Sequence, residues 1–161
     1  MKTFLEKLSQ LQLGISMISL VAVIGINFIE ILGRYLFNSS LVWVQDVSLL
    51  FMVWMIFPGS SVIAYQKRDV VITLLTDVLP ERANKHLDYF KNGAVSLFFL
   101  VFSYYTLTLF LKQQGQTTVT ASLPLQWYTL SLLINSSYVF LVYLREFMLD
   151  ITGKNLEKEG Q

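Results

Sequence analysis

Three charged side chains near the ends of apolar segments are the first candidates for chemistry: Glu30, Arg34 and Asp46. Glu30 and Arg34 are four residues apart, so on one helix they would share a face and could form an ion pair worth about 0.2 to 0.5 kcal/mol if exposed. The alternative without an ion pair or a functional role is a helix end at which these charges are solvated by water alone. The functional alternative is that Arg34 or Asp46 contacts another protein chain.

Catalytic and metal chemistry have few residues to draw on in this sequence of 161 residues. It contains one histidine, His86, and no cysteine. Disulfides, thiolate metal sites and cysteine nucleophiles are therefore excluded, and one copy of the chain cannot supply the paired histidines of a membrane haem. No phosphate-binding loop, metal-ligand spacing or nucleophile elbow is present. We therefore predict no enzyme activity and no catalytic, cofactor-binding or metal-binding residues.

The composition is that of an integral membrane protein. Hydrophobic residues make up 54% of the chain and charged residues 14%, and the mean hydropathy is +0.55. The net charge of +1 gives no case for nucleic-acid binding. About 20 uncharged helical residues span the roughly 30 Å of bilayer hydrocarbon. The gaps between charges therefore predict an all-α fold with four transmembrane helices in one domain, residues 1–161, with spans at about 8–29, 44–66, 92–111 and 125–144.

The segments between the spans are polar or charged. We expect a short turn from Gly33 to Trp43 and an exposed loop from Gln113 to Thr120. The middle segment, Lys67 to Lys91, contains an amphipathic pattern that fits either an interfacial helix or a continuous lead-in to the third span. Both interpretations stay open at this point.

The distribution of basic residues predicts the orientation. Ten of the twelve Lys and Arg residues lie in the N-terminal segment, the middle segment and the tail, whereas the two short loops hold only Arg34 and Lys112. Lys and Arg accumulate on the cytoplasmic side. We therefore expect both termini in the cytoplasm and the two short loops outside, with the first span retained as an anchor.

The centres of the four spans contain no ionisable residue, although ion and proton pathways usually require one. Small and neutral polar residues in spans two and four are instead candidates for helix packing: Gly59, Ser60, Ala64, Asn135 and Ser136. Such a chain fits a scaffold or accessory subunit better than a complete transporter.

Several short motifs together resemble the small permease subunit of tripartite ATP-independent periplasmic (TRAP) transporters. They are Arg34-Tyr35-Leu36-Phe37-Asn38, then Leu41-Val42-Trp43 and Asp46, then Gly59 before Lys67-Arg68-Asp69, and Ala121-Ser122-Leu123-Pro124 before the last span. The resemblance covers residues 5–150. The chain departs from the family at Gln45, where members often carry a second acid, and at Val70, where they often carry histidine.

This resemblance implies a heterodimer in the bacterial inner membrane. A large permease subunit would hold the substrate and sodium sites and move as an elevator, while the small subunit braces its fixed scaffold. A periplasmic binding protein would deliver an organic acid, such as sialic acid or a C4-dicarboxylate, for sodium symport. Candidate residues for docking that binding protein lie near the outer ends of the spans: Arg34, Asn38, Trp43, Asp46, Gln114 and Trp127.

Two other functions are also compatible with four membrane spans. A dimeric four-helix small-molecule/proton exporter would need an acid deep in its first span, and residues 8–29 contain none. A haem-free membrane anchor subunit of a respiratory complex also fits the composition. Co-purification distinguishes them, since a TRAP subunit should bring a large multi-span partner and an exporter only another copy of itself.

Overall fold

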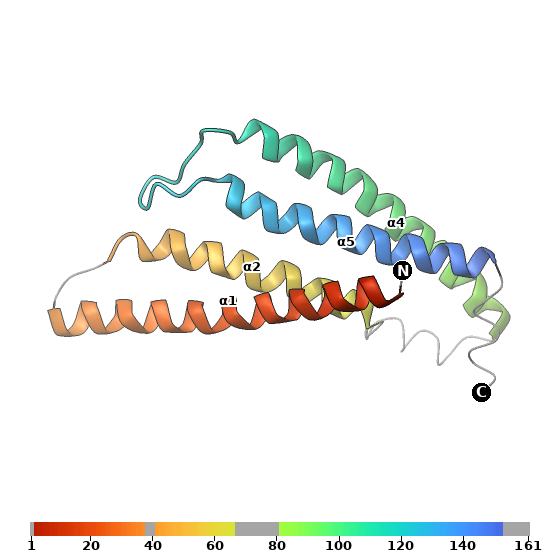
Figure 1. Cartoon of the computed structure of the whole chain (residues 1–161), viewed down its shortest axis with the longest axis horizontal. Coiled ribbons are helices and arrows are strands. Elements are labelled where there is room, and N and C mark those ends of the chain that lie inside the picture. The colour runs from red at the N-terminus through yellow and green to blue at the C-terminus, as the bar shows by residue number, and fades with distance from the viewer. Residues whose placement is uncertain (1, 38–40, 67–80, 153–161) are drawn as a thin grey trace.

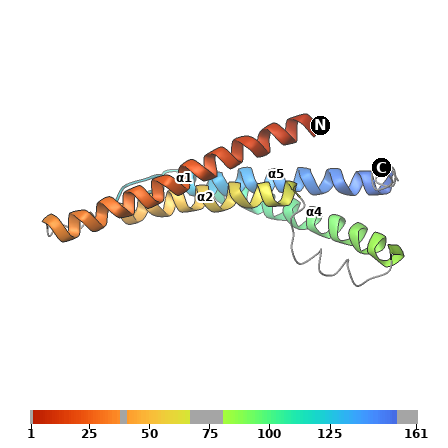
Figure 2. The same cartoon turned by 90° about the horizontal axis from the view of Figure 1, so that it is seen from below.

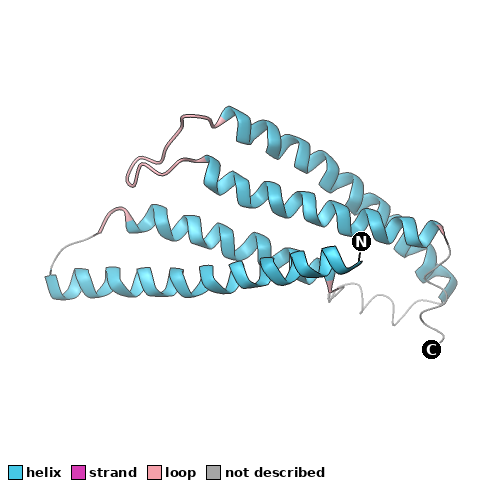
Figure 3. Ribbon diagram, in the orientation of Figure 1, coloured by secondary structure: helices cyan, strands magenta, loops and turns pink. Residues whose placement is uncertain are grey.

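Four long helices make up most of the protein. The computed structural model describes residues 2–37, 41–66 and 81–152. Its helices are α1 (Lys2–Phe37), α2 (Val44–Tyr65), α4 (Glu81–Lys112) and α5 (Gln126–Ile151) (Figure 1). Each contains a stretch long and apolar enough to cross a membrane: Phe4–Leu36, Val44–Tyr65, Tyr89–Lys112 and Gln126–Leu149. The predicted all-α fold with four membrane-spanning helices is confirmed, and the described residues outside the helices form loops and turns (Figure 3).

The helices form two hairpins that pack against each other through one helix of each. α1 packs on α2 and α4 packs on α5, and the contact between α2 and α5 connects the pairs. The spatial order is therefore α1, α2, α5, α4, with α1 and α4 at the two edges (Figure 1). In the perpendicular view, α1 crosses this layer obliquely (Figure 2). The N-terminal end of α1 thereby reaches α5.

Three helices, α1, α4 and α5, are longer than the charge-free runs suggested. α1 has 36 residues, or about 54 Å of helix, which exceeds the roughly 30 Å of bilayer hydrocarbon. The prediction that the chain turns from Gly33 onward was wrong, because α1 continues to Phe37. Likewise α5 continues through Arg145 to Ile151. A charge next to a span marks the membrane boundary, but it leaves the backbone hydrogen bonds of the helix intact.

The middle segment was open to two interpretations, and the structure supports the lead-in. α4 begins at Glu81 and runs without interruption to Lys112. The charged residues from 81 to 91 are therefore the first turns of the third membrane helix. Residues 67–80 lie outside the described part of the chain.

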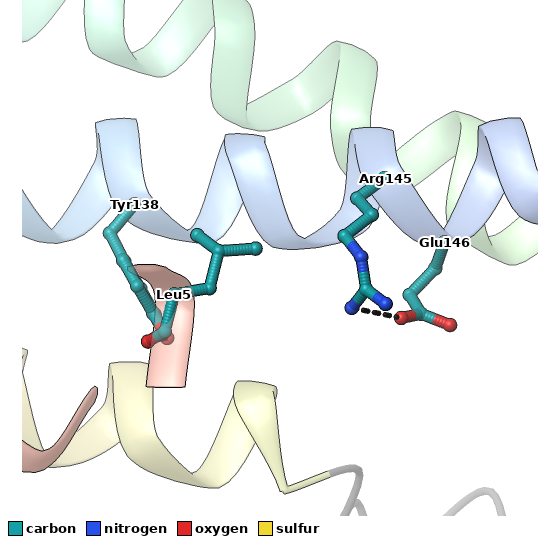
Figure 4. Close-up of polar contacts among 4 residues, drawn as sticks. All are labelled: Leu5, Tyr138, Arg145 and Glu146. Carbon is teal, nitrogen blue, oxygen red and sulfur yellow. Dashed lines mark hydrogen bonds and ion pairs between the residues drawn. The ribbon is translucent and has the colours of Figure 1, made fainter. Parts of the chain in front are cut away.

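A small apolar core lies at the end of the layer where α1 begins. Leu5 from α1 packs against Tyr138, Val139 and Val142 of α5, and partly buried side chains from α2 and α4 complete the cluster. The Tyr138 hydroxyl, in a side chain that is 2% exposed, donates to the Leu5 carbonyl oxygen at 3.0 Å (Figure 4). A buried phenol needs such an acceptor. This bond fixes the N-terminal turns of α1 on α5.

Small residues allow the helices of each hairpin to approach closely. A Cβ atom on Gly59 of α2 would lie 3.0 Å from the Ser16 hydroxyl of α1, and this hydroxyl donates to the Met55 carbonyl at 2.7 Å. In the other hairpin, a Cβ atom on Gly93 would lie 3.1 Å from the Phe147 ring. Van der Waals contact of this kind is a main source of helix association in lipid.

The contact between α2 and α5 is polar. The Ser61 hydroxyl of α2 donates to the side-chain oxygen of Asn135 on α5, and the Ser60 hydroxyl reaches the same oxygen at 3.4 Å. Ser61 and Ser136 are fully buried, and Asn135 is 5% exposed. We call this group, Ser60, Ser61, Asn135 and Ser136, the polar seam. Ala64, one turn further along α2, packs on the apolar core.

The close approach at Gly59 predicts a large effect of added volume. Gly59→Leu should push α1 from α2 and lower the free energy of unfolding by about 1 to 3 kcal/mol, as overpacking usually does. Gly14→Leu is the matched control, since a Cβ atom on Gly14 meets nothing within 4 Å. Thermal unfolding in detergent micelles measures both variants. Equal melting temperatures for the two would show that α1 and α2 do not pack as described.

Buried amides give a second prediction, with opposite signs at two positions. Gln12 is 2% exposed, and neither side-chain polar atom has a hydrogen-bond partner among residues 2–37, 41–66 and 81–152. Gln12→Leu should therefore raise the melting temperature, because an unpaired buried polar group costs about 1 to 3 kcal/mol. Asn135→Leu should lower it, because Ser61 loses its acceptor. A lower melting temperature for Gln12→Leu would reveal a partner for this amide.

Candidate functional site

Asp46 joins the first turn of α2 to the loop between α4 and α5. Its carboxylate oxygen Oδ2 accepts the backbone N–H groups of Ala121 at 2.8 Å and Thr120 at 3.2 Å. The positive end of the α2 dipole favours an acidic residue at this position. A single side chain in one hairpin therefore holds the loop of the other.

The start of α5 is fastened to α2 by two further bonds. The Tyr128 hydroxyl donates to the backbone carbonyl of Asp46 at 2.8 Å, and the Trp54 indole donates to the Trp127 carbonyl at 3.0 Å. We call the contacts among Asp46, Thr120, Ala121 and Tyr128 the loop clasp. The clasp and the polar seam lie at different levels of the same interface between α2 and α5.

The loop held by the clasp has a defined backbone structure. Thr118 donates its N–H to the Leu123 carbonyl at 2.8 Å, and Leu125 donates to the Gln116 carbonyl at 3.0 Å. An isolated antiparallel bridge pairs Thr117 with Pro124. Gly115 has a φ of +78°, a conformation that glycine adopts without steric cost. The loop is therefore a compact, internally bonded turn.

The surface that this loop presents is uncharged. Gln114, Gln116, Thr117 and Thr120 are exposed, and Val119 at the tip is fully exposed. The sequence carries no charged residue from Gln113 to Leu144. Such a surface can donate and accept hydrogen bonds and can bury one apolar side chain, but it does not attract a partner through charge.

A different pair of charges lies at the same end of the protein, on α1. The Arg34 guanidinium donates to the Glu30 carboxylate one turn earlier, so the ion pair that their spacing allows is present and the helix end is not solvated by water alone. The Arg34 side chain is 61% exposed, whereas the Glu30 side chain is 15% exposed. At the opposite end, Arg145 pairs with Glu146 at 3.3 Å (Figure 4). Within the described ranges, no three His, Asp or Glu side chains gather into a candidate metal site.

The structure brings together the described members of the predicted docking set. Arg34 lies near the C-terminal end of α1, Trp43 and Asp46 at the start of α2, Gln114 in the loop, and Trp127 at the start of α5; all of these elements meet at the left end of the molecule in Figure 1. Trp43 and Trp127 are about half exposed. Asp46 differs, since its carboxylate already accepts two N–H groups from within the chain. Asn38 lies outside the described residues.

Sequence reasoning found Asp46 but missed its partners. Thr120 and Ala121 contribute backbone N–H groups, which every residue except proline carries, so residue type does not point to these bonds. Tyr128 and Trp54 carry side-chain donors, but aromatic residues are common at membrane boundaries and their hydrogen bonds are not encoded by spacing. The site therefore becomes visible only when α2 and α5 are placed side by side.

Comparisons with known proteins agree with this membrane architecture. Residues 9–153 match the family model described as tripartite ATP-independent periplasmic transporters, DctQ component. The chain is 29% identical over 90 residues to the sialic acid TRAP transporter permease protein SiaT of Haemophilus influenzae strain 86-028NP, a match that covers 56% of this chain and 15% of that protein. It is 25% identical over 129 residues to a protein of Haemophilus influenzae strain Rd that carries the name of a TRAP transporter small permease protein, covering 80% of this chain and 78% of the relative.

The loop clasp predicts how the loop should exchange its amide hydrogens. Asp46→Ala removes the acceptor of the Thr120 and Ala121 N–H groups, so these amides should exchange several-fold faster in a nanodisc. Asp46→Asn should have a smaller effect, because its amide oxygen still accepts. Gln45→Ala is the control at the neighbouring position and should leave the loop unchanged. Unaltered exchange in Asp46→Ala would show that the loop keeps its structure without the clasp.

Proposed function

The chain belongs to the DctQ family, the DctQ component of tripartite ATP-independent periplasmic (TRAP) transporters, and on this premise we propose that it braces the large permease subunit as part of the fixed scaffold. It is a transport component and a multi-pass protein of the bacterial inner membrane. The observation that carries the proposal is the family match over residues 9–153 of a chain whose helices are four membrane spans.

The distribution of exposed apolar residues supports the bracing role. The edge helices α1 and α4 each carry an exposed apolar face, which in a membrane contacts lipid or another chain. Exposed members include Leu11, Met17, Ile18, Val21 and Ile24 on α1, and Leu97, Phe98, Val101, Tyr104 and Tyr105 on α4. A neighbouring membrane subunit could therefore pack against either edge of the layer, on α1 or on α4.

The interior of the layer supports the same role. In the polar seam, the hydroxyls of Ser60 and Ser61 donate to the Asn135 side-chain oxygen, and Ser136 donates to the Leu133 carbonyl of its own helix. Ser103 bonds to Ser137 at 3.0 Å between α4 and α5. The centres of the spans carry no ionisable residue. Polar groups that are satisfied within the bundle contribute to packing and offer no charged path for an ion.

The second part of the proposal is that the end of the bundle carrying the loop clasp helps to dock the periplasmic binding protein. The exposed Gln114, Trp43 and Trp127 would contact the partner directly, with Arg34 at the edge. Asn38, which lies outside the described residues, stays a candidate from the sequence alone. Asp46 would act by positioning the loop, because both of its loop contacts are internal. The excess of basic residues in the other segments favours placing this end in the periplasm and both termini in the cytoplasm.

Sodium coupling and substrate choice would reside in the other subunits. We infer a heterodimer with the large permease that takes up an organic acid with sodium. The name of the SiaT relative favours a sialic acid, and a C4-dicarboxylate is the second candidate. The relative's length, of which this match covers 15%, leaves ample room for a large permease part in that protein.

Reconstitution tests the proposed function. Vesicles that contain this chain alone should show no gradient-driven flux of sialic acid or a C4-dicarboxylate. Vesicles that contain the chain with the large permease, supplied with the binding protein, should show uptake that requires a sodium gradient. The same chain, extracted from native membranes in mild detergent, should co-purify with a large multi-span protein. Flux catalysed by the chain alone would contradict the bracing role and favour an exporter.

A further inference from the structure

A groove separates α1 from α2 at the end of the bundle that carries the loop clasp. Its volume is about 480 Å³, and its lining includes Asn27, Glu30 and Arg34 from α1 and Ser48, Leu49 and Met52 from α2. This volume lies within the roughly 300 to 1,000 Å³ typical of sites for small organic molecules. Both walls belong to helices that qualify as membrane spans, Phe4–Leu36 and Val44–Tyr65. An occupant would therefore enter from the bilayer or its boundary.

We call the end of the groove at Glu30 and Arg34 its mouth, and both of these residues are charged. Arg34 lies about two turns, or roughly 10 Å, further along α1 than Asn27. Its side chain is 61% exposed, and one of its terminal nitrogens donates to Glu30. A guanidinium has five N–H donors, so donors remain for a second acceptor. Glu30 thereby orients Arg34 without saturating it.

We call the other end of the groove, at Asn27, Leu49 and Met52, its deep end, and it offers mainly apolar surface. The Asn27 side-chain amide donates to the Val23 carbonyl at 2.8 Å and to the Ser48 hydroxyl at 3.0 Å, so these polar groups are paired within the protein. Leu49 is 52% exposed and Met52 is 42% exposed. Carbon surface is therefore what this end offers to an occupant. Polarity falls from the mouth inward along the helices.

We propose that this groove binds one glycerophospholipid, with its phosphodiester on Arg34 and an acyl chain along Leu49 and Met52. The order of groups in the groove matches the order of groups in the lipid, an anionic acceptor followed by hydrocarbon. Arginine pairs with phosphate oxygens through two parallel N–H donors, which is a strong and directional contact. An apolar transmembrane helix of a neighbouring subunit would fill the apolar end but would bring no anion to Arg34. Gly59 allows the close approach of α1 and α2 near Ser16. The bound lipid would set the separation of the same helices at the end of the bundle that carries the loop clasp.

Site-specific photocrosslinking tests the proposal in native bacterial membranes with the full chain and its partners. A photoreactive benzoylphenylalanine at Met52 samples the deep end of the groove. The same group at Ile63, which is 51% exposed on α2 and outside the groove, samples ordinary lipid contact. Mass spectrometry of the purified chain identifies each adduct as phospholipid or protein. Arg34→Gln removes the phosphate contact, and Lys112→Gln removes an exposed cation at the same end of the bundle as the matched control.

The expected result is a phospholipid adduct at Met52 that falls several-fold in Arg34→Gln and is unchanged in Lys112→Gln, while any lipid adduct at Ile63 responds to neither. A protein adduct at Met52 would overturn the proposal by showing that a partner subunit occupies the groove. A lipid adduct at Met52 that is insensitive to Arg34→Gln would also overturn it, since that is the behaviour of bulk lipid. Neither result depends on uptake activity, so the proposed function can stand or fall separately.

Discussion

The interface between α2 and α5 holds the molecule together, because it is the main contact between the two hairpins. Two sets of contacts stabilise it, the loop clasp at one end and the polar seam in the middle. At the other end, the Tyr138 bond to Leu5 and its apolar cluster join α5 to α1. In a bilayer, lipid tails do not drive helices together through the hydrophobic effect, so packing and hydrogen bonds must do so. Polar contacts accordingly occur both within the hairpins, as between Asn27 and Ser48, and where the hairpins meet, as between Ser61 and Asn135.

This distribution relates the fold to the proposed role. A chain that buries few large apolar side chains and exposes many along α1 and α4 completes its packing with lipid or with another protein. Its internal polar groups are used to hold neighbouring helices in register. In the proposed role this layer of helices would widen the fixed part of a larger assembly. The uncharged loop at one end is held by Asp46.

Much of the fold could be predicted from the positions of charges, and most of the site could not. Charge-free runs revealed four helices because bilayer thickness sets their length. The charge-free runs misplaced the ends of α1 and α5, because a charged residue was expected to lie beyond the helix. Arg34 and Arg145 instead lie inside these helices, where each forms an ion pair with a residue of the same helix. Ser60 and Asn135 were both predicted to pack helices. The fully buried residue that donates to the Asn135 side-chain oxygen is however Ser61, and the Ser60 hydroxyl lies 3.4 Å from the same oxygen. One residue turns a helix by about 100°, and the sequence alone does not fix that rotation.

As part of a fixed scaffold, α2 and α5 should keep the same relative position while the transporter works, and a reversible crosslink tests this most directly. The sequence contains no cysteine, so Ser61→Cys with Asn135→Cys introduces a single reactive pair across the interface. Uptake by the whole transporter in vesicles is measured before oxidation, after oxidation and after reduction. The account predicts that closing the disulfide leaves the uptake rate unchanged. Loss of uptake on oxidation, restored by reduction, would show that this interface moves and would contradict the fixed-scaffold role.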